Sequence, residues 1–254
     1  MKTKPNGKNE VDVSIVFPAY NEGENLENAV RRTTQALKEI TDSYEIIIAE
    51  DGSTDGTDRI AARLASGSLF IRHIHKNNRL GRGLALKNAF KESNGRILVY
   101  MDVDLATSIG QLRALIEAVS QDCDFATGSR MLPASKVTRS FSRQITSKSY
   151  NFMARAILGS KVADHQCGFK AGKREALLEI LDDVKATHWF WDTETLIRAQ
   201  RRGYEVKEIP IEWAETGRTK VRLIEDSLSM GSQILKLWWE LRRKPDRGKA
   251  RSDY

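Results

Sequence analysis

The chain has 254 residues and 40% apolar content, enough for one large α/β domain with a full core or at most two small ones, and we interpret it as one. Its formal net charge of +7 favours anionic partners, namely a nucleotide, a phosphorylated lipid, a membrane surface or nucleic acid, although solubility alone accounts for it as well. The two cysteines and the polar start argue against a disulfide framework and a secretion signal, and no apolar run reaches the roughly 18 residues that cross a membrane, so we expect a cytoplasmic protein.

Short apolar runs alternate with segments of helical spacing along much of the chain. The predicted strands span residues 11–20, 44–51, 69–75, 96–104, 124–130 and, later, 204–213. The predicted helices span residues 23–40, 53–66, 81–93 and 109–120, with later ones that begin at Arg174 and Asp192. Strands that alternate with helices of this length predict an α/β fold with a mostly parallel central sheet and helices on both faces.

Four of the predicted strands end in polar residues, at 18–22 ("PAYNE"), 50–55 ("EDGSTD"), 102–104 ("DVD") and 128–130 ("GSR"). In open parallel sheets, ligands collect at the carboxyl ends of the strands. Any one of these motifs could serve only to solvate the rim of the sheet, but four together are difficult to explain in that way. We therefore predict one ligand site at this edge.

Asp102 and Asp104 end an apolar strand and, being two residues apart, point to the same side. Their charges repel unless a cation lies between them. Mg²⁺ or Mn²⁺ is normally held by one or two carboxylates and completes its shell with water and substrate phosphates. Such an ion would also stabilise charge on a departing diphosphate. The common glycine-rich phosphate loops are absent from the sequence: neither the turn after the first strand nor the glycines from Gly81 onward have their spacing. We therefore expect a metal ion and scattered Arg and Lys residues to bind the phosphates.

Six motifs, "FPAYNE", "EDGSTDGT", "DVDLATS", "GSR", "DHQCGFK" and "FWDTE", follow one another in an order that resembles the family 2 glycosyltransferases of the GT-A fold. The resemblance covers about residues 11–225. Within the family, the chain most resembles the branch that makes polyprenyl-phosphate sugars. The motif "DHQCGFK" is most similar to that of the dolichyl-phosphate glucosyltransferase type. It implies a GT-A fold and an inverting, metal-dependent transfer of a sugar from a nucleotide diphosphate to a polyprenyl (dolichyl) phosphate.

The resemblance also implies roles for individual residues. Asp51 would accept a hydrogen bond from a base N–H, which we expect to be uracil, and the Val103 backbone would lie near the ribose. The other nucleoside contacts would be Pro18, Ala19, Tyr20 and Glu22. Asp102 and Asp104 would bind Mg²⁺ or Mn²⁺. Lys220 would close over the diphosphate with Arg218 beside it. The sequence departs from the family at Glu50, usually an aspartate, and at Ala106, where some relatives have a further polar group.

On the acceptor side, the resemblance places Arg130, Arg143 and Ser147 at the lipid phosphate. A phosphate with a second pKa near 6 is largely ionised at neutral pH and needs no general base to attack. Its placement in line with the sugar is then the main requirement, and cations would provide it. The alternative is that Arg143 and Lys148 only solvate a surface helix.

Asp192 has three interpretations. In sugar transferases with hydroxyl acceptors an aspartate near this place acts as base. It could instead be the N-cap of the helix that follows, or a contact to the donor sugar, and we favour these two.

Two helices have the pattern of a membrane interface, although packing in the core or at a dimer contact would fit as well. Residues 145–158 carry an apolar stripe with Lys148 and Arg155 beside it, and Trp238 and Trp239 stand directly before basic residues near the end. We expect peripheral binding at the cytosolic face of a membrane. The chain is accordingly divided into a disordered leader (1–10), a catalytic domain (11–225) with an acceptor and interfacial segment (133–160), a C-terminal amphipathic helix (226–244) and a disordered basic tail (245–254).

The predicted donor is UDP-glucose, with GDP-mannose as the alternative. A family 2 transferase with a hydroxyl acceptor, such as a glycan or a small molecule, is a first rival and would need Asp192 as base. A non-enzymatic basic module that binds nucleic acid or lipid is a second rival, and it predicts dispensable acids at the strand ends. We expect an enzyme that does not bind nucleic acid.

Overall fold

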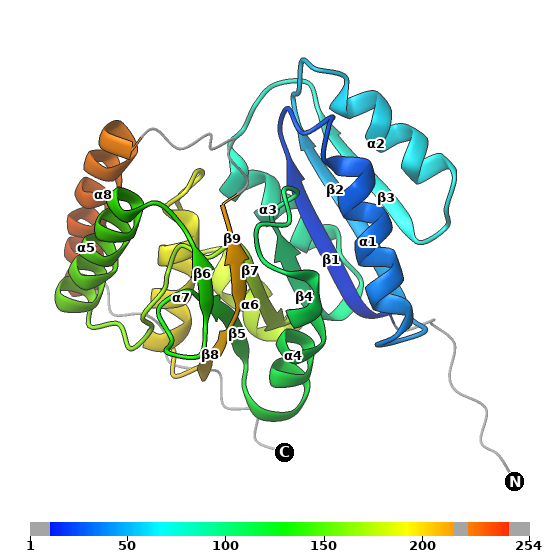
Figure 1. The fold of residues 1–254 in the computed structure, drawn as a ribbon. Coiled ribbons are helices and arrows are strands. Elements are labelled where there is room, and N and C mark those ends of the chain that lie inside the picture. The colour runs from blue at the N-terminus through cyan, green and yellow to red at the C-terminus, as the bar shows by residue number, and fades with distance from the viewer. Residues whose placement is uncertain (1–10, 216–222, 244–254) are drawn as a thin grey trace, which may run out of the picture.

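The computed structural model describes residues 11–215 and 223–243, which fold around a seven-stranded sheet (Figure 1). The strand order is β3-β2-β1-β4-β7-β5-β8, and only β7 runs antiparallel to its neighbours, β4 and β5. The strands are β1 (Val11–Ala19), β2 (Tyr44–Asp51), β3 (Ile71–Lys76), β4 (Gly95–Met101), β5 (Phe125–Ser129), β7 (Phe169–Lys173) and β8 (Val206–Pro210). The predicted α/β fold with a mostly parallel sheet is confirmed.

Helices cover both faces of the sheet. One face packs against α1 (Leu26–Lys38), α2 (Thr57–Ser66) and α4 (Leu112–Glu117), and the other against α3 (Arg82–Glu92), α6 (Arg174–Leu181) and α7 (Trp191–Arg201). Because both faces are covered, β2 is buried along its whole length, which explains the continuous apolar run in its sequence.

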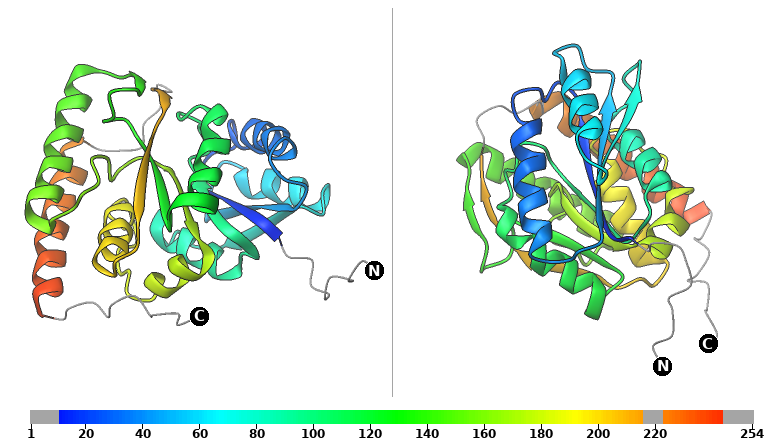
Figure 2. Two further views of the ribbon diagram at one scale, coloured as in Figure 1. Left: turned by 90° about the horizontal axis from the view of Figure 1, so that it is seen from below. Right: turned by 90° about the vertical axis from the view of Figure 1, so that its right-hand side faces the viewer.

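Two further helices, α5 (Phe141–Leu158) and α8 (Leu223–Arg243), lie side by side at one end of the molecule (Figure 2). Tyr150, Ile234 and Leu237 from this pair pack together with Ile197 of α7. No helix in the described part of the chain is both long and apolar enough to cross a membrane.

The predicted strand 204–213 is two strands in the structure. After β8 in the main sheet, the chain forms β9 (Glu212–Ala214), which pairs with β6 (Lys136–Thr138) in a separate two-stranded sheet. Pro210 has no amide hydrogen with which to continue the main ladder, and the N–H of Ile211 donates instead to Ser135 Oγ. The predicted helix 109–120 is likewise divided into a 3₁₀ turn (Ile109–Gln111), α4 and a π turn (Ala118–Asp122).

Candidate functional site

The site is built where β4 ends and β7 begins. Asp102 directly follows β4, and its N–H donates to the carbonyl of Gly168, 3.1 Å away, just before β7. A Cβ at Gly168 would lie 1.9 Å from Asp102 Oδ2, so only glycine leaves room for this carboxylate. Since β7 is antiparallel, its first residues lie at the same edge as the carboxyl ends of the other strands.

One guanidinium joins two acids at this edge. Arg82, the first residue of α3, donates from Nη2 to Asp102 Oδ1 at 2.8 Å and from Nη1 to Asp192 Oδ2 at 2.6 Å. The Asp102 side chain is 41% exposed, whereas that of Asp192 is only 4% exposed. Arg82 therefore connects an open carboxylate to a buried one.

Lys170 of β7 lies on the other side of Asp192. Its Nζ is 3.0 Å from Asp192 Oδ1, and it donates hydrogen bonds to the backbone carbonyls of His165 and Cys167. Burial lowers the pKa of Lys170 to about 8. Burial also raises the pKa of Asp192 to about 6, against the opposing effect of Arg82.

The interpretation of Asp192 as the N-cap of its helix is wrong. Helix α7 begins one residue earlier, at Trp191, with Phe190 as N-cap. The Asp192 carboxylate faces Arg82 and Lys170 instead. Its roles as base or as donor-sugar contact remain predictions.

The loop after Asp102 is attached to the small sheet. Leu105 has a positive φ of 50°, and Asp104 Oδ1 accepts a hydrogen bond from the Ala106 N–H at 3.0 Å. The Ala106 carbonyl and the Ser108 N–H then bond to the backbone of β9, each at 2.9 Å. The loop that follows the residues predicted to bind metal is thus fixed to β9 on both sides of Trp213.

The loops after β1 and β2, which carry the predicted nucleoside residues, are tied to each other. Asn21 Oδ1 accepts from the Thr54 N–H, and the Glu22 N–H donates to Thr57 Oγ1, both at 2.8 Å. The Tyr20 ring is covered by the guanidinium of Arg79, with Cζ 3.9 Å from the ring centroid. Pro18 and Ala19 are the last two residues of β1, directly before these loops, and Val103 is buried in the core.

Asp51 is buried, and both of its carboxylate oxygens accept hydrogen bonds from backbone N–H groups. The N–H groups of Leu80 and Gly81 donate to it at 2.7 and 2.8 Å. Gly81 has a φ of 101°, and a Cβ there would lie 2.5 Å from the carbonyl oxygen of Thr187. Asp51 thus shapes the turn that presents Arg82, and its predicted contact with a nucleobase remains a prediction.

Two arginines, Arg130 and Arg139, lie beside Trp213, and the charge of Arg143 acts on Arg139. Arg130 makes a two-pronged contact with the fully buried Asp164, from Nε at 2.7 Å and Nη2 at 2.8 Å, and Arg143 forms an ion pair with Glu215. The guanidinium carbons of Arg130 and Arg139 lie 5.6 and 5.4 Å from the centre of the Trp213 ring.

Arg139 has no carboxylate partner among the described residues, and its Nε is buried without a hydrogen bond. Burial, reinforced by the charge of Arg130, lowers the pKa of Arg139 to about 10. Of the predicted acceptor residues, Ser147 is buried and its hydroxyl donates to Gln166 Oε1 at 3.1 Å. The arrangement therefore holds three guanidiniums against two acids, which suits an anion.

Comparison with known proteins shows the family of the chain. The family model of glycosyl transferase family 2 matches residues 14–181, more than half of the chain. The chain belongs to glycosyl transferase family 2. The expected glycosyltransferase is thereby confirmed, and the rival of a non-enzymatic module is not supported.

Relatives within family 2 match over nearly the whole chain. Glycosyltransferase AglD of Haloferax volcanii is 50% identical over 92% of this chain, but the chain spans only 38% of AglD. Polyprenol monophosphomannose synthase of Mycolicibacterium smegmatis is 31% identical over 93% of this chain and 89% of that protein. Dolichyl-phosphate beta-glucosyltransferase of Saccharomyces cerevisiae is 28% identical over 89% and 74%.

Among solved structures, glucosyl-3-phosphoglycerate synthase from Mycobacterium tuberculosis in complex with UDP has the same fold. It aligns with a TM-score of 0.66 at 20% identity and covers 97% of this chain and 88% of that one. The expected GT-A fold of a family 2 enzyme is confirmed.

Several residues at this edge of the sheet and beside Trp213 were not among the predicted site residues. Lys170 closes the motif "DHQCGFK", and Arg82 stands between two glycines at the start of a predicted helix, so both had a sequence signal. Arg139 lies in a segment with many basic residues and had none. Arg218 and Lys220, predicted to close over the diphosphate, lie outside the described residues, as do the predicted leader and tail.

Proposed function

We propose that this family 2 glycosyltransferase moves one sugar, glucose from UDP-glucose, onto a polyprenyl (dolichyl) phosphate with inversion at the sugar carbon. The observation that carries the proposal is the group formed by Arg130, Arg139 and Arg143, beside the loop of Asp102 and Asp104. It provides a site for an anionic acceptor next to a site for a nucleotide diphosphate.

The arginine group fits a phosphate monoester. Arg130 and Arg143 are paired with Asp164 and Glu215, so Arg139 supplies the positive charge that is not neutralised. A guanidinium can bind two phosphate oxygens at once. The ionised phosphate needs no general base, and these residues would hold one of its oxygens in line with the sugar carbon.

The residues at the end of β4 fit a divalent cation. Asp102 and Asp104 offer carboxylate oxygens, the donors that Mg²⁺ and Mn²⁺ prefer, and a small pocket lined by Asp102, Ala106 and Gly168 adjoins them. A structure of the mycobacterial synthase contains Mn²⁺ and UDP. When bound, such an ion would neutralise the leaving diphosphate. Arg82, which holds Asp102 Oδ1 in this structure, would orient that carboxylate and add positive charge on the diphosphate side.

The relatives support the acceptor class and leave two donors in question. The yeast relative is named for dolichyl phosphate and glucose, and the mycobacterial relative for polyprenol phosphate and mannose. We choose glucose because "DHQCGFK" is similar to the glucosyltransferase type. Transfer from GDP-mannose is the alternative.

Exposed apolar side chains support binding at a membrane surface. On α5, Phe141 and Phe152 are 77% and 72% exposed, and on α8 Trp239 is 54% exposed beside Arg243, whose guanidinium lies over its ring. Apolar residues next to cations are typical of helices that lie at lipid headgroups. We place the catalytic domain, residues 11–225, at the cytosolic face, with α5 and α8 against the lipid.

The proposal is tested by incubating the full chain with Mn²⁺ or Mg²⁺, a polyprenyl phosphate and a panel of radiolabelled nucleotide sugars. We expect label from UDP-glucose to become lipid-soluble, and UDP to raise the melting temperature more than GDP does. A preference for GDP and GDP-mannose under matched metal would replace glucose by mannose. Label that enters only water-soluble products would contradict the lipid acceptor.

Asp192→Asn distinguishes phosphate from hydroxyl acceptors. The pKa of Asp192 is about 6, so as a base it would become active as the pH rises through that value. With a phosphate acceptor, which titrates in the same range, we expect the variant to keep the pH dependence of transfer. A hydroxyl acceptor would instead require the base, and its removal would cost about a hundredfold or more. Initial rates from pH 5 to 8 give the answer.

A further inference from the structure

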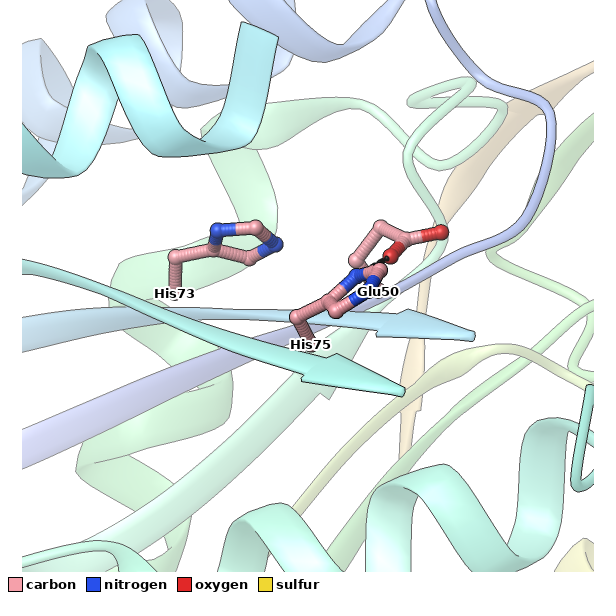
Figure 3. Close-up of side chains that lie close together, drawn as sticks. All are labelled: Glu50, His73 and His75. Carbon is pink, nitrogen blue, oxygen red and sulfur yellow. Dashed lines mark hydrogen bonds and ion pairs between the residues drawn. The ribbon is translucent and has the colours of Figure 1, made fainter. Parts of the chain in front are cut away.

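A second group of metal-binding side chains lies two strands away from β4, where β2 and β3 run side by side. Glu50, His73 and His75 each offer one ligand atom, and these atoms all lie within 4.8 Å of one another (Figure 3). The sheet register pairs Glu50 with His75 and Ile48 with His73, so the three side chains share one face of the sheet. This is the face that α2 covers.

The contacts of these side chains indicate which atom of each would bind a metal ion. His73 Nε2 is buried without a hydrogen bond, and Figure 3 shows its ring directed toward Glu50 and His75. His75 Nδ1 lies 2.5 Å from Glu50 Oε2, while its Nε2 lies 3.0 Å from Asn77 Oδ1. Glu50 Oε1 accepts from the Ser53 N–H. A metal ion bound by Glu50 Oε2, His73 Nε2 and His75 Nδ1 would therefore replace the present contact between Glu50 and His75.

We propose that Glu50, His73 and His75 bind one Zn²⁺ ion. Two imidazoles and one carboxylate form a donor set that zinc uses in proteins, with water in the remaining position. Nitrogen donors also separate this site from the oxygen-only set at Asp102, which suits Mg²⁺ or Mn²⁺.

The surroundings favour a bound cation. Asn77 Oδ1 would accept the other N–H of His75, the type of outer contact that orients metal-binding imidazoles. Asp58, in the first turn of α2, adds negative charge close enough to act on both histidines. The His75 side chain is 44% exposed, so an ion can enter from solvent.

A metal ion at this site would stabilise the loops after β1 and β2, which carry the predicted nucleoside residues, without contacting the reacting groups. Glu50 holds the Ser53 N–H, and Ser53 Oγ accepts from the Asn21 N–H at 3.0 Å. Zinc would therefore fix the loops after β1 and β2 to β3, an edge strand of the sheet. We expect its main effect to be on stability.

The test uses the full chain without a histidine tag, freed of metal by a chelator. Calorimetric titration with Zn²⁺ should show one saturable site per chain, and Co²⁺ should give visible absorption bands of a nitrogen-bound ion in low coordination. His75→Ala should weaken Zn²⁺ binding by about a hundredfold or more and remove the Co²⁺ bands. Since His75 is half-exposed, His75→Ala should fold. His75→Gln is a second variant without the imidazole, and it should likewise lose Zn²⁺ binding while its circular dichroism stays near that of the unmodified chain.

Asp102→Asn is the matched control because it alters the other predicted metal site, and it should leave Zn²⁺ affinity and the Co²⁺ bands unchanged. The absence of saturable Zn²⁺ binding would overturn the proposal. So would equal binding by His75→Ala, or bands that disappear only in Asp102→Asn. None of these measurements depends on sugar transfer, so the zinc site is tested independently of the proposed function.

Discussion

Asp102→Asn should abolish metal-supported sugar transfer while the fold stays intact. The substitution removes one anionic ligand from the cation site and loosens the contact to Arg82. Several kcal/mol of charge stabilisation would be lost, which corresponds to a rate reduction of about a thousandfold or more. Initial rates with saturating Mn²⁺, together with circular dichroism and melting temperature, measure both parts of the expectation.

Two further variants make this result specific. Gly168→Ala removes no carboxylate from the chain but puts a Cβ 1.9 Å from Asp102 Oδ2, so this carboxylate must move and transfer should also fall. Asp182→Asn makes the same chemical change at a surface acid that is 77% exposed, and it should have no effect. Full activity of Asp102→Asn, or of the unmodified chain in EDTA, would contradict the metal role.

The parallel half of the sheet could be predicted from the sequence because its information is local. Four strands, β1, β2, β4 and β5, end in polar residues, and strands that run in the same direction bring those ends to one edge. That reasoning placed Asp102 correctly at the edge. It could not place Gly168 and Lys170, because the reversed direction of β7 depends on the path of the chain and not on the short segment "FKAGK".

The contacts between acidic and basic side chains could not be predicted from the sequence either, because they also depend on the path of the chain. Arg82 and Asp192 meet across a separation of 110 residues, so neither residue's neighbours indicate the pair. Asp51 ends a strand as predicted, but its use by two backbone N–H groups depends on the close approach of Gly81 to Thr187. Burial, which raises the pKa of Asp192 and lowers that of Lys170, likewise comes only from the folded chain.

The arginine group gives the second large expected effect, and Arg139 is its most informative member. Arg139→Ala should reduce transfer to polyprenyl phosphate by about a hundredfold, the scale for the loss of one preorganised electrostatic donor. UDP affinity should change little, because Arg139 lies beside Trp213 and not among the loops that carry the nucleoside residues. Transfer kinetics with varied lipid phosphate and calorimetry with UDP separate the two effects.

Two further variants of the arginine group test the same reasoning. Arg143→Ala should also impair transfer with little change in UDP binding. Arg139→Lys should retain part of the activity that Arg139→Ala loses, since lysine keeps the charge but not the planar fork of the guanidinium. Arg96→Ala is the matched control, because Arg96 is an exposed arginine at the start of β4, on the opposite edge of the sheet, and it should transfer normally. If Arg139→Ala weakens UDP binding as much as transfer, the arginines belong to the donor side, and the lipid-phosphate acceptor loses the observation on which it rests.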